Sequence, residues 1–231
     1  MVELPYFYFP SLATAYESAT LDEITRHHVV TVLRMQPSQK IMLMDGVGNV
    51  AEGIIQEGSK KTLSVLLGEK IAYPNSIPKI TLAISVLKNA NRFEWMLEKV
   101  TEIGVSEIIP LISDRTERTH FREDRLRQII VSASLQSKQS WMPILHLPQK
   151  VHDVIQEAKS VNKFIAHCID TQKDMLKKQA QDAIILIGPE GDFTIPEIDF
   201  ALAQGFTPVS LGESRLRTET AGVAAAVLMK L

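Results

Sequence analysis

The sequence is poor in cysteine, in net charge and in long apolar runs, and each shortage excludes a class of protein. Cys168 is the single cysteine in 231 residues, so no disulfide framework holds the chain and a reducing compartment is expected. The formal net charge of −2 excludes a strongly basic protein, so any contact with nucleic acid must come from a local patch. No apolar run approaches the length of a membrane span, and no signal peptide is recognised at the amino terminus. We expect a cytoplasmic protein that is not bound to a membrane.

Residues 1–72 have the pattern of a small β-rich domain. Short apolar segments separated by turns predict strands at 40–45, 50–56 and 62–67, and helical spacing precedes them at 22–34. Sequential short strands of this kind predict a small barrel or sheet. Between Tyr73 and Pro78, two prolines bracket polar residues, which is typical of a linker. We therefore predict two domains, at 1–72 and 73–231.

From residue 73 onward, apolar strands alternate with amphipathic helices, which predicts an α/β domain with a largely parallel sheet. The expected strands are 80–87, 105–112, 144–147, 163–168, 183–187 and 208–211. Capping-box spacing predicts two helix starts, at Asn91 with Glu94 and at Thr194 with Glu197. The last helix is expected from about Thr218 and is rich in alanine and glycine, which favours close packing against another helix or backbone.

Two glycine-bearing turns near the carboxyl terminus are the strongest candidates for a ligand site. One apolar strand leads into Gly188-Pro189-Glu190-Gly191, and the next leads into Gly212. Small residues at a strand exit let a ligand approach the backbone. Ligands of open α/β sheets bind at the carboxyl ends of the strands. Because each turn leads into a predicted helix, we expect the two turns to form one site.

Local spacing leaves the chemistry of these turns open. The first lacks the spacing and the Lys-Ser or Lys-Thr of a phosphate loop, so a tight turn before a capped helix is an adequate interpretation. After the second turn, residues 215–220 place two arginines and two hydroxyl groups before an apolar helix. An anion site at the free helix amides and a helix cap with a surface ion pair are both consistent with that pattern.

Other polar clusters favour ordinary structural roles. Residues 114–127 mix arginines with acidic side chains, which favours a solvated, salt-bridged surface. His27 and His28 lack further ligands at suitable spacing, so no metal site is expected. No serine elbow and no cysteine–histidine signature is present.

Motifs spread along the chain carry a resemblance to a known family. They are His28 with Val32-Leu33-Arg34, Asp45-Gly46, 88–105, Gln136-Ser137, 187–191 and 211–221. The last two, in this order and separation, are specific. Through them the chain resembles, nearly from end to end, the ribosomal RNA small-subunit methyltransferase E family of the knotted SPOUT class.

The resemblance implies a fold and an activity. The fold would be a PUA-like β-barrel that helps to hold RNA, followed by a SPOUT-type α/β domain with a parallel sheet and a trefoil knot. The activity would be methylation of N3 of a uridine in 16S ribosomal RNA, free or within the assembled small subunit, by a homodimer using S-adenosylmethionine (S-adenosyl-L-methionine). A catalytically inactive RNA-binding or ribosome-assembly protein that retains the fold is the alternative.

The resemblance also assigns roles to particular residues. The expected cofactor-binding residues are Ile187, Gly188, Gly191, Leu211, Gly212, Leu216, Thr218 and Thr220. For catalysis, Arg217 is expected to stabilise charge on the uracil oxygens, and Glu190, Glu219 or water to accept the N3 proton. The candidates for contacts to RNA phosphates are Arg26, Arg34, Lys88, Arg92, Arg115 and Arg118.

Three positions depart from the family pattern. Asp192 stands where the family commonly has the last glycine of Gly-Pro-Glu-Gly-Gly. Leu135 and Gln139 replace the acidic residue and the arginine of the usual Glu-Gln-Ser-x-Arg. Contacts that the family makes through those two side chains do not carry over to this chain.

Overall fold

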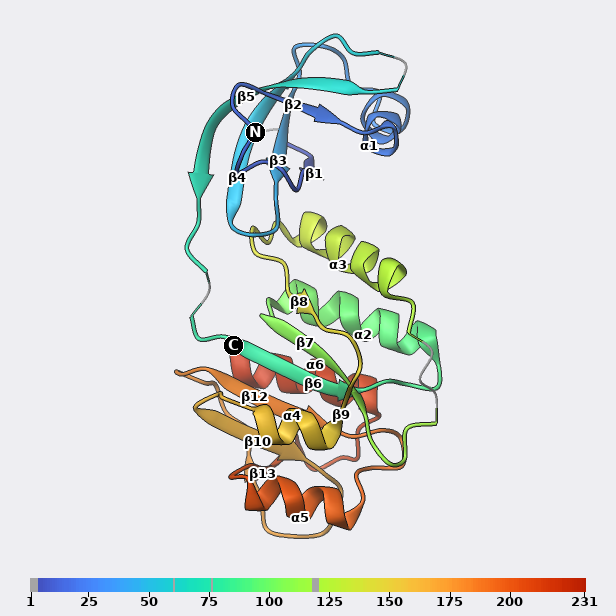
Figure 1. The fold of residues 1–231 in the computed structure, drawn as a ribbon, viewed down its shortest axis with the longest axis vertical. Coiled ribbons are helices and arrows are strands. Elements are labelled where there is room, and N and C mark those ends of the chain that lie inside the picture. The colour runs from blue at the N-terminus through green and yellow to red at the C-terminus, as the bar shows by residue number, and fades with distance from the viewer. Residues whose placement is uncertain (1–3, 60, 76, 118–120) are drawn as a thin grey trace. The chain divides into compact units, whose positions relative to one another are not determined.

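The structure is a computed structural model that describes residues 4–59, 61–75, 77–117 and 121–231 (Figure 1). Contacts within the chain divide it into two compact units. The first comprises residues 1–75 together with 134–142, and the second comprises 76–133 together with 143–231. A short segment from the second half of the sequence therefore belongs to the amino-terminal unit.

The amino-terminal unit contains a five-stranded sheet in the order β1-β3-β4-β5-β2. Its strands are β1 (Tyr6–Tyr8), β2 (Ser18–Leu21), β3 (Lys40–Met44), β4 (Asn49–Ile55) and β5 (Leu63–Ala72). Its helical segments are α1 (Glu23–His27) and the π-helix η1 (His28–Val32). Alternate side chains of the strands, such as Ile41 and Leu43 of β3, point into one apolar core that also contains Phe7 and Val65.

The sequence predicts the three central strands of this unit but not its two edge strands. β1 and β2 are short, and they pair with β3 and β5, which lie far from them in the sequence. β5 continues past the predicted end at Leu67 to Ala72 because its backbone still pairs with β4, although most side chains there are exposed. The helix expected at 22–34 is found as α1 followed by the π-helix, a tertiary detail that apolar spacing does not specify.

Residues 139–142 pack against the turn that joins β3 to β4. Met142 N donates to Gly46 O at 2.9 Å, and Trp141 Nε1 donates to Tyr73 O at 2.9 Å. Gly48 has a φ of 101°, and a Cβ built there would lie 2.7 Å from the Trp141 ring. The turn therefore requires glycine at this position both for its backbone conformation and for the space that the indole fills.

The carboxy-terminal unit is built on an eight-stranded sheet in the order β11-β13-β10-β12-β6-β7-β8, with β9 also paired to β7. Every pairing in it is parallel, as the alternation of strands and helices predicts. The strands are β6 (Ile80–Ser85), β7 (Glu107–Ile112), β8 (Ile144–Leu145), β9 (Gln149–Lys150), β10 (Asn162–Ala166), β11 (Asp174–Met175), β12 (Ala183–Ile187) and β13 (Thr207–Ser210). The trefoil knot implied by the resemblance stays a prediction.

Helices cover both faces of this sheet (Figure 1). They are α2 (Ala90–Ile103), α3 (Glu123–Ser137), α4 (Val151–Glu157), α5 (Ile195–Ala203) and α6 (Thr218–Lys230). On one face, α6 packs on α2 and β6, and a Cβ at Gly222 would lie 2.7 Å from Ile84 Cδ1. The small residues of α6 thus serve packing within the chain. Among the described residues, no helix is long and apolar enough to cross a membrane.

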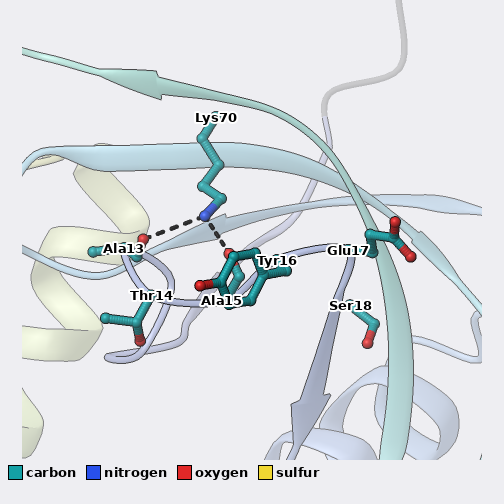
Figure 2. Close-up of a pocket in the computed structure, with 7 residues that line it drawn as sticks. All are labelled: Ala13, Thr14, Ala15, Tyr16, Glu17, Ser18 and Lys70. Carbon is teal, nitrogen blue, oxygen red and sulfur yellow. Dashed lines mark hydrogen bonds between the residues drawn. The ribbon is translucent and has the colours of Figure 1, made fainter.

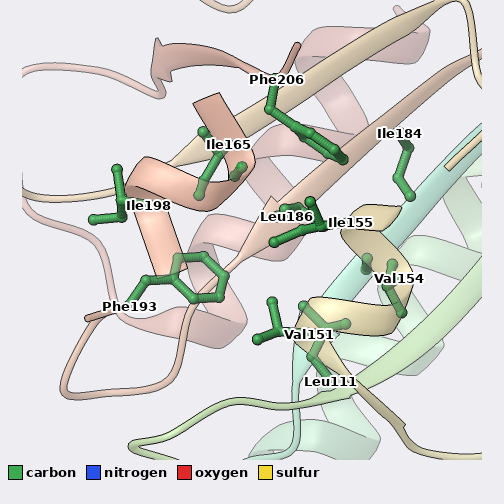
Figure 3. Packing of buried hydrophobic residues seen from close by; sticks show 12 residues of the cluster. Leu111, Val151, Val154, Ile155, Ile165, Ile184, Leu186, Phe193, Ile198 and Phe206 are labelled. Atoms are coloured by element: carbon green, nitrogen blue, oxygen red, sulfur yellow. The ribbon is translucent and has the colours of Figure 1, made fainter. Parts of the chain in front are cut away.

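The other face of the sheet carries an apolar cluster (Figure 3). Ala83 of β6 and Leu186 of β12 meet Val154 of α4 and Ile198 of α5 there. Because both faces are covered, every residue of β6 and β12 is buried, which accounts for the predominantly apolar sequence of these strands.

One of the two predicted capping boxes is wrong and the other is confirmed. Helix α2 begins at Ala90, and its N-cap is Asn89, whose side chain accepts from Asn91 N at 3.0 Å. Asn91 already lies within the helix, because the extended backbone that a cap needs occurs at Asn89. Glu94 instead accepts two bonds of 2.6 Å from Arg125. The capping box at the start of α5 is present as predicted.

Candidate functional site

The register of the parallel sheet brings four strand ends to one level. One row across neighbouring strands β6, β12, β10 and β13 contains Ile84, Ile187, Ala166 and Val209. The residues that follow them in sequence are Ser85, Gly188, His167 and Ser210. The two glycine turns therefore leave the same edge of the same sheet, on either side of the end of β10. This is the arrangement expected for a single site.

The first turn, after β12, is held by contacts to its backbone. Arg115 Nη1 donates to Gly191 O at 2.7 Å, and Asp192 N donates to Pro189 O at 2.9 Å. Gly188 is buried, and a Cβ there would lie 3.1 Å from both the ring and the backbone nitrogen of Phe193. Gly188 is therefore tightly enclosed, and a side chain there would displace Phe193.

Asp192 ties the first turn to the end of β10. Its φ is 64°, a left-handed conformation that suits glycine and that aspartate tolerates better than most residues. Its Oδ2 accepts from Cys168 N at 2.7 Å, and its Oδ1 accepts from Phe193 N at 2.8 Å. The departure from glycine therefore keeps the backbone conformation and adds two hydrogen bonds.

Glu197 connects the end of β7 to the start of α5. Its Oε1 accepts from Asp114 N at 2.9 Å, and its Oε2 accepts from Thr194 N at 2.7 Å and from Thr194 Oγ1 at 2.9 Å. The carboxylate is buried, so these charge-assisted bonds replace its lost water. The capping-box spacing predicts the bonds to Thr194 but not the bond to Asp114.

The second turn, after β13, is held by a serine. Ser210 Oγ donates to Gly212 O at 3.0 Å and accepts from Gly212 N at 3.3 Å. Gly212 has a φ of 137°, and a Cβ built there would meet nothing within 4 Å. Glycine is required at this position by backbone conformation alone, and the space beside it is open.

The first turn of α6 carries a buried carboxylate beside this edge. Thr218 and Glu219 are buried, whereas Arg217, the N-cap residue, is exposed and makes no side-chain cap bond. Glu219 Oε1 lies 3.6 Å from Arg92 Nε in α2. Glu219 Oε2 is buried and has no hydrogen-bond partner among the described residues. A buried acceptor that lacks a partner is uncommon in native structures and marks a place for a ligand or water.

The structure gathers the predicted cofactor-binding and catalytic residues on three neighbouring segments. These segments are the two turns and the start of α6, and they carry Ile187, Gly188, Glu190, Gly191, Leu211, Gly212, Leu216, Arg217, Thr218, Glu219 and Thr220. Ile187 and Gly188 are buried, Leu211, Gly212 and Leu216 are half-buried, and Glu190, Gly191 and Thr220 are exposed. Thr218 and Glu219 are buried, and Arg217 is exposed.

The predicted RNA-binding residues are more scattered. Lys88 follows β6 and forms an ion pair of 2.6 Å with Glu117, and that hydrogen bond and charge, with a smaller effect of Glu190, raise the pKa of Lys88. Arg115 bonds to the first turn, and Arg92 pairs with Glu219. In the amino-terminal unit, Arg26 Nε donates to Ser59 O at 2.8 Å. Arg34 is also in that unit and is exposed, and Arg118 lies outside the described residues.

Sequence reasoning missed His167. Its ring nitrogen Nδ1 is buried and has no hydrogen-bond partner among the described residues. The sequence predicts a strand over 163–168 that includes His167, whereas β10 ends at Ala166 and His167 is the first residue after it. Ser85, the last residue of β6, also has a buried hydroxyl group without a partner in the described part of the chain.

The amino-terminal unit has a surface hollow of its own (Figure 2). It is lined by residues 13–18 and Lys70, whose Nζ donates to Ala13 O and Ala15 O. The lysine charge is thus engaged with loop carbonyl groups, and the hollow offers no cluster of catalytic groups. Nor do the described residues contain a group of three or more His, Cys, Asp or Glu side chains that could hold a metal ion.

Comparison with known proteins gives consistent matches. The sequence model of a family described as an RNA methyltransferase domain matches residues 74–230, and that of an RNA methyltransferase PUA domain matches residues 21–67. Ribosomal RNA small subunit methyltransferase E from Synechocystis sp. is 30% identical over 214 residues, which cover 88% of this chain and 70% of that protein.

Solved structures agree over almost the whole chain. A probable rRNA-methyltransferase from Porphyromonas gingivalis superposes with a TM-score of 0.89 at 37% identity, covering 97% of this chain and 96% of that one. A ribosomal RNA small subunit methyltransferase E from Neisseria gonorrhoeae, solved bound to S-adenosyl methionine, gives a TM-score of 0.86 at 29% identity with the same coverage. By sequence and by fold, the chain belongs to the ribosomal RNA small-subunit methyltransferase E family.

Proposed function

We propose that this chain transfers the methyl group of S-adenosylmethionine to N3 of a uridine in the 16S ribosomal RNA of the small subunit. The observation that carries the proposal is the common sheet edge from which both glycine turns leave, with the start of α6 following the second turn. The relatives' names support ribosomal RNA as the substrate. The cofactor in the Neisseria gonorrhoeae structure supports S-adenosylmethionine as the methyl donor.

The residues at this edge fit such a cofactor. Gly188 and Gly212 present backbone without side chains, and the space beside Gly212 is open. We propose that these two turns, with Leu216 and Thr218, hold the adenosine and methionine portions. When bound, S-adenosylmethionine supplies an electrophilic methyl group on a sulfonium. The contribution of the protein is then to position the uracil ring in line with that group.

The N3 atom of uridine carries a proton that must leave before or during methyl transfer. Of the two candidate carboxylates, Glu190 is exposed on the first turn, and Glu219 is buried with one oxygen lacking a partner in the described chain. We assign proton acceptance to Glu219, because its free oxygen needs to break no hydrogen bond within the protein. Glu190 remains the alternative acceptor.

We propose that Arg217 acts on the uracil oxygens. It stands at the N-cap of α6, exposed, between the second turn and Glu219. A guanidinium group there can stabilise the negative charge that develops on the ring when the N3 proton leaves. The uridine must be unpaired or rotated out of its helix to reach this position.

RNA binding belongs to the same proposal. Arg34, Arg26 and Lys88 supply phosphate contacts, with Arg115, Arg92 and Arg118 as further candidates. We also propose that the protein acts in the cytoplasm and that it forms a homodimer. Light scattering of the purified protein tests the homodimer.

The experiment uses purified protein, labelled S-adenosylmethionine, and either free 16S ribosomal RNA or assembled small subunits. Mass spectrometry of the digested RNA should show one new N3-methyluridine, and the two substrates together show which form is used. Calorimetric titration with S-adenosylmethionine tests the alternative of an inactive RNA-binding protein. Binding of the RNA without binding of the cofactor would favour that alternative.

A further inference from the structure

His167 occupies the position between the two glycine turns. Ala166, the last residue of β10, pairs with Ile187 on one side and with Val209 on the other. His167 is the next residue, so it leaves the sheet between the residues that begin the two turns. No other residue of the row is flanked by both turns in this way.

The backbone around His167 is fixed by hydrogen bonds. Lys173 Nζ donates to His167 O at 2.6 Å and to Ile169 O at 2.7 Å, which closes the loop after β10. Cys168 N donates to Asp192 Oδ2 at 2.7 Å, which ties that loop to the first glycine turn. The backbone position of His167 is therefore held by contacts on both sides.

The ring itself lacks the partner that its burial calls for. Nδ1 of His167 is buried and bonds to no other described residue. Burial first, and then the charge of Lys173, lower the pKa of His167, and the charge of Asp192 opposes them. The ring is therefore neutral at neutral pH, and offers one donor and one acceptor nitrogen.

We propose that His167 is a cofactor-binding residue whose Nδ1 forms a hydrogen bond with the adenosine portion of S-adenosylmethionine. This inference rests on the proposed function, since it places the cofactor between the two turns. A neutral imidazole complements a hydroxyl or amino group, and adenosine presents both kinds of group.

Calorimetric titration of His167 variants tests the proposal. His167→Leu removes both ring nitrogens and should weaken S-adenosylmethionine binding at least tenfold. His167→Asn keeps a polar group near the position of Nδ1 and should stay within about threefold of the wild type, whereas His167→Gln, which places its amide farther out, should resemble the leucine variant. His27→Leu, an exposed histidine in the amino-terminal unit, serves as the matched control and should leave the affinity unchanged.

A second ligand locates the contact. Methylthioadenosine keeps the adenosine portion and lacks the amino-acid portion, so His167→Leu should weaken its binding by the same factor. If methylthioadenosine binds the variant and the wild type equally, the contact is not to adenosine and the proposal is wrong. Equal binding of S-adenosylmethionine to both proteins would also overturn it.

A spectroscopic measurement covers the case in which a variant fails to fold. In wild-type protein with nitrogen-15 labelled histidine, cofactor addition should shift the His167 Nδ1 resonance, assigned by its loss in His167→Asn. A wild type that binds cofactor with no shift at Nδ1 would count against the proposal. A wild type that does not bind S-adenosylmethionine at all would instead contradict the proposed function.

Discussion

Arg92 Nε lies 3.6 Å from Glu219 Oε1, and this pair joins the first turn of α2 to the first turn of α6. The Glu219 side chain is 10% exposed and that of Arg92 is 40% exposed. Solvent therefore partly screens the pair. Loss of the arginine should lower the free energy of unfolding by about 1–2 kcal/mol, which is less than for a fully buried pair. We expect Arg92 to position Glu219, and a phosphate contact is the alternative role for this residue.

Replacement of Arg92 separates these two roles. Arg92→Met should lower kcat about tenfold, because an unsupported Glu219 is less well placed, and should leave the salt dependence of RNA binding unchanged. Arg34→Met, in the exposed part of the amino-terminal unit, should reduce the salt slope by about one and leave kcat unaltered. RNA affinity measured over a range of KCl concentrations gives both slopes. A smaller slope for Arg92→Met would return this residue to the phosphate contacts.

Substitution of Glu219 and Glu190 tests the assignment of the proton acceptor. Glu219→Gln keeps the shape of the side chain but removes its basic oxygen, so methylation should slow by about 10²–10⁴-fold. Glu190→Gln, at an exposed position of the first turn, should slow it by less than about threefold. Single-turnover rates with saturating cofactor are the measurement. The reverse order of rates would identify Glu190 as the acceptor.

Gly212 offers a test of the second turn with a control in the same chain. Gly212→Ala introduces a side chain into open space. It should lower the free energy of unfolding by about 1–3 kcal/mol, and this loss comes from the φ of 137° alone. Gly205→Ala, at the end of α5, meets the same open space at a φ of 83° and should cost about 1–2 kcal/mol. Urea unfolding should show comparable losses. Only Gly212→Ala should weaken cofactor binding, by about tenfold or more; equal cofactor affinity in both variants would remove the second turn from the site.

The sequence predicts the central strands β6 and β12 well because they are buried on both faces, whereas the two-residue strands β9 and β11 are not predicted. β12 is a continuous apolar run, and β6 is apolar except for Thr81 and Ser85; a buried strand or a fully buried helix has that pattern. The edge strands β1 and β2 are not predicted, since their backbone partners lie far along the chain. The predicted start of α2 is wrong because Asn89 and Asn91 are equally good caps by residue type, and only backbone geometry distinguishes them.

The candidate site likewise has parts that the sequence predicts and parts that it does not. The two turns are visible in the sequence, since glycine and proline directly after an apolar strand indicate a tight turn. The hydrogen bonds that connect the strand ends could not be predicted. Asp192 accepts from Cys168 N and Glu197 accepts from Asp114 N, and these residues are neighbours only because of the order of the strands in the sheet. His167 is missed for this reason, because its importance arises only when β10 is known to lie between β12 and β13.

The contact between α2 and α3 should appear in the acid stability of the protein. The hydrogen bond and charge of Arg125, aided by Arg122, hold the pKa of Glu94 below its ordinary value against the effect of burial. A carboxylate with a lowered pKa stabilises the fold above its unfolded-state pKa, and that stability is lost as the pH falls through the folded-state pKa.

Glu94→Gln should therefore be less stable than the wild type near neutral pH, and the difference should shrink below about pH 4.5, the ordinary glutamate value. Arg125→Met should reproduce this behaviour. Arg127→Met, which removes the exposed pair with Glu123 within α3, should change stability by less than about 0.5 kcal/mol at any pH. Urea unfolding midpoints measured between pH 3 and 7 test the prediction. A stability difference between Glu94→Gln and the wild type that does not change with pH would contradict it.

Asp192 allows the backbone and side-chain contributions at one position to be separated. Asp192→Gly removes two hydrogen bonds, but glycine adopts the left-handed conformation without strain. The free energy of unfolding should therefore fall by only about 1 kcal/mol. Asp192→Ala loses the same bonds and keeps the unfavourable φ of 64°, and should cost about 2–3 kcal/mol. Asp192→Asn retains an acceptor and tolerates the conformation, and should lie closest to the wild type. Stability in the order Asn, Gly, Ala, measured by urea unfolding, would show that aspartate replaces the family's glycine by bonding Cys168. If alanine and glycine are equal, the left-handed backbone at this position carries no cost.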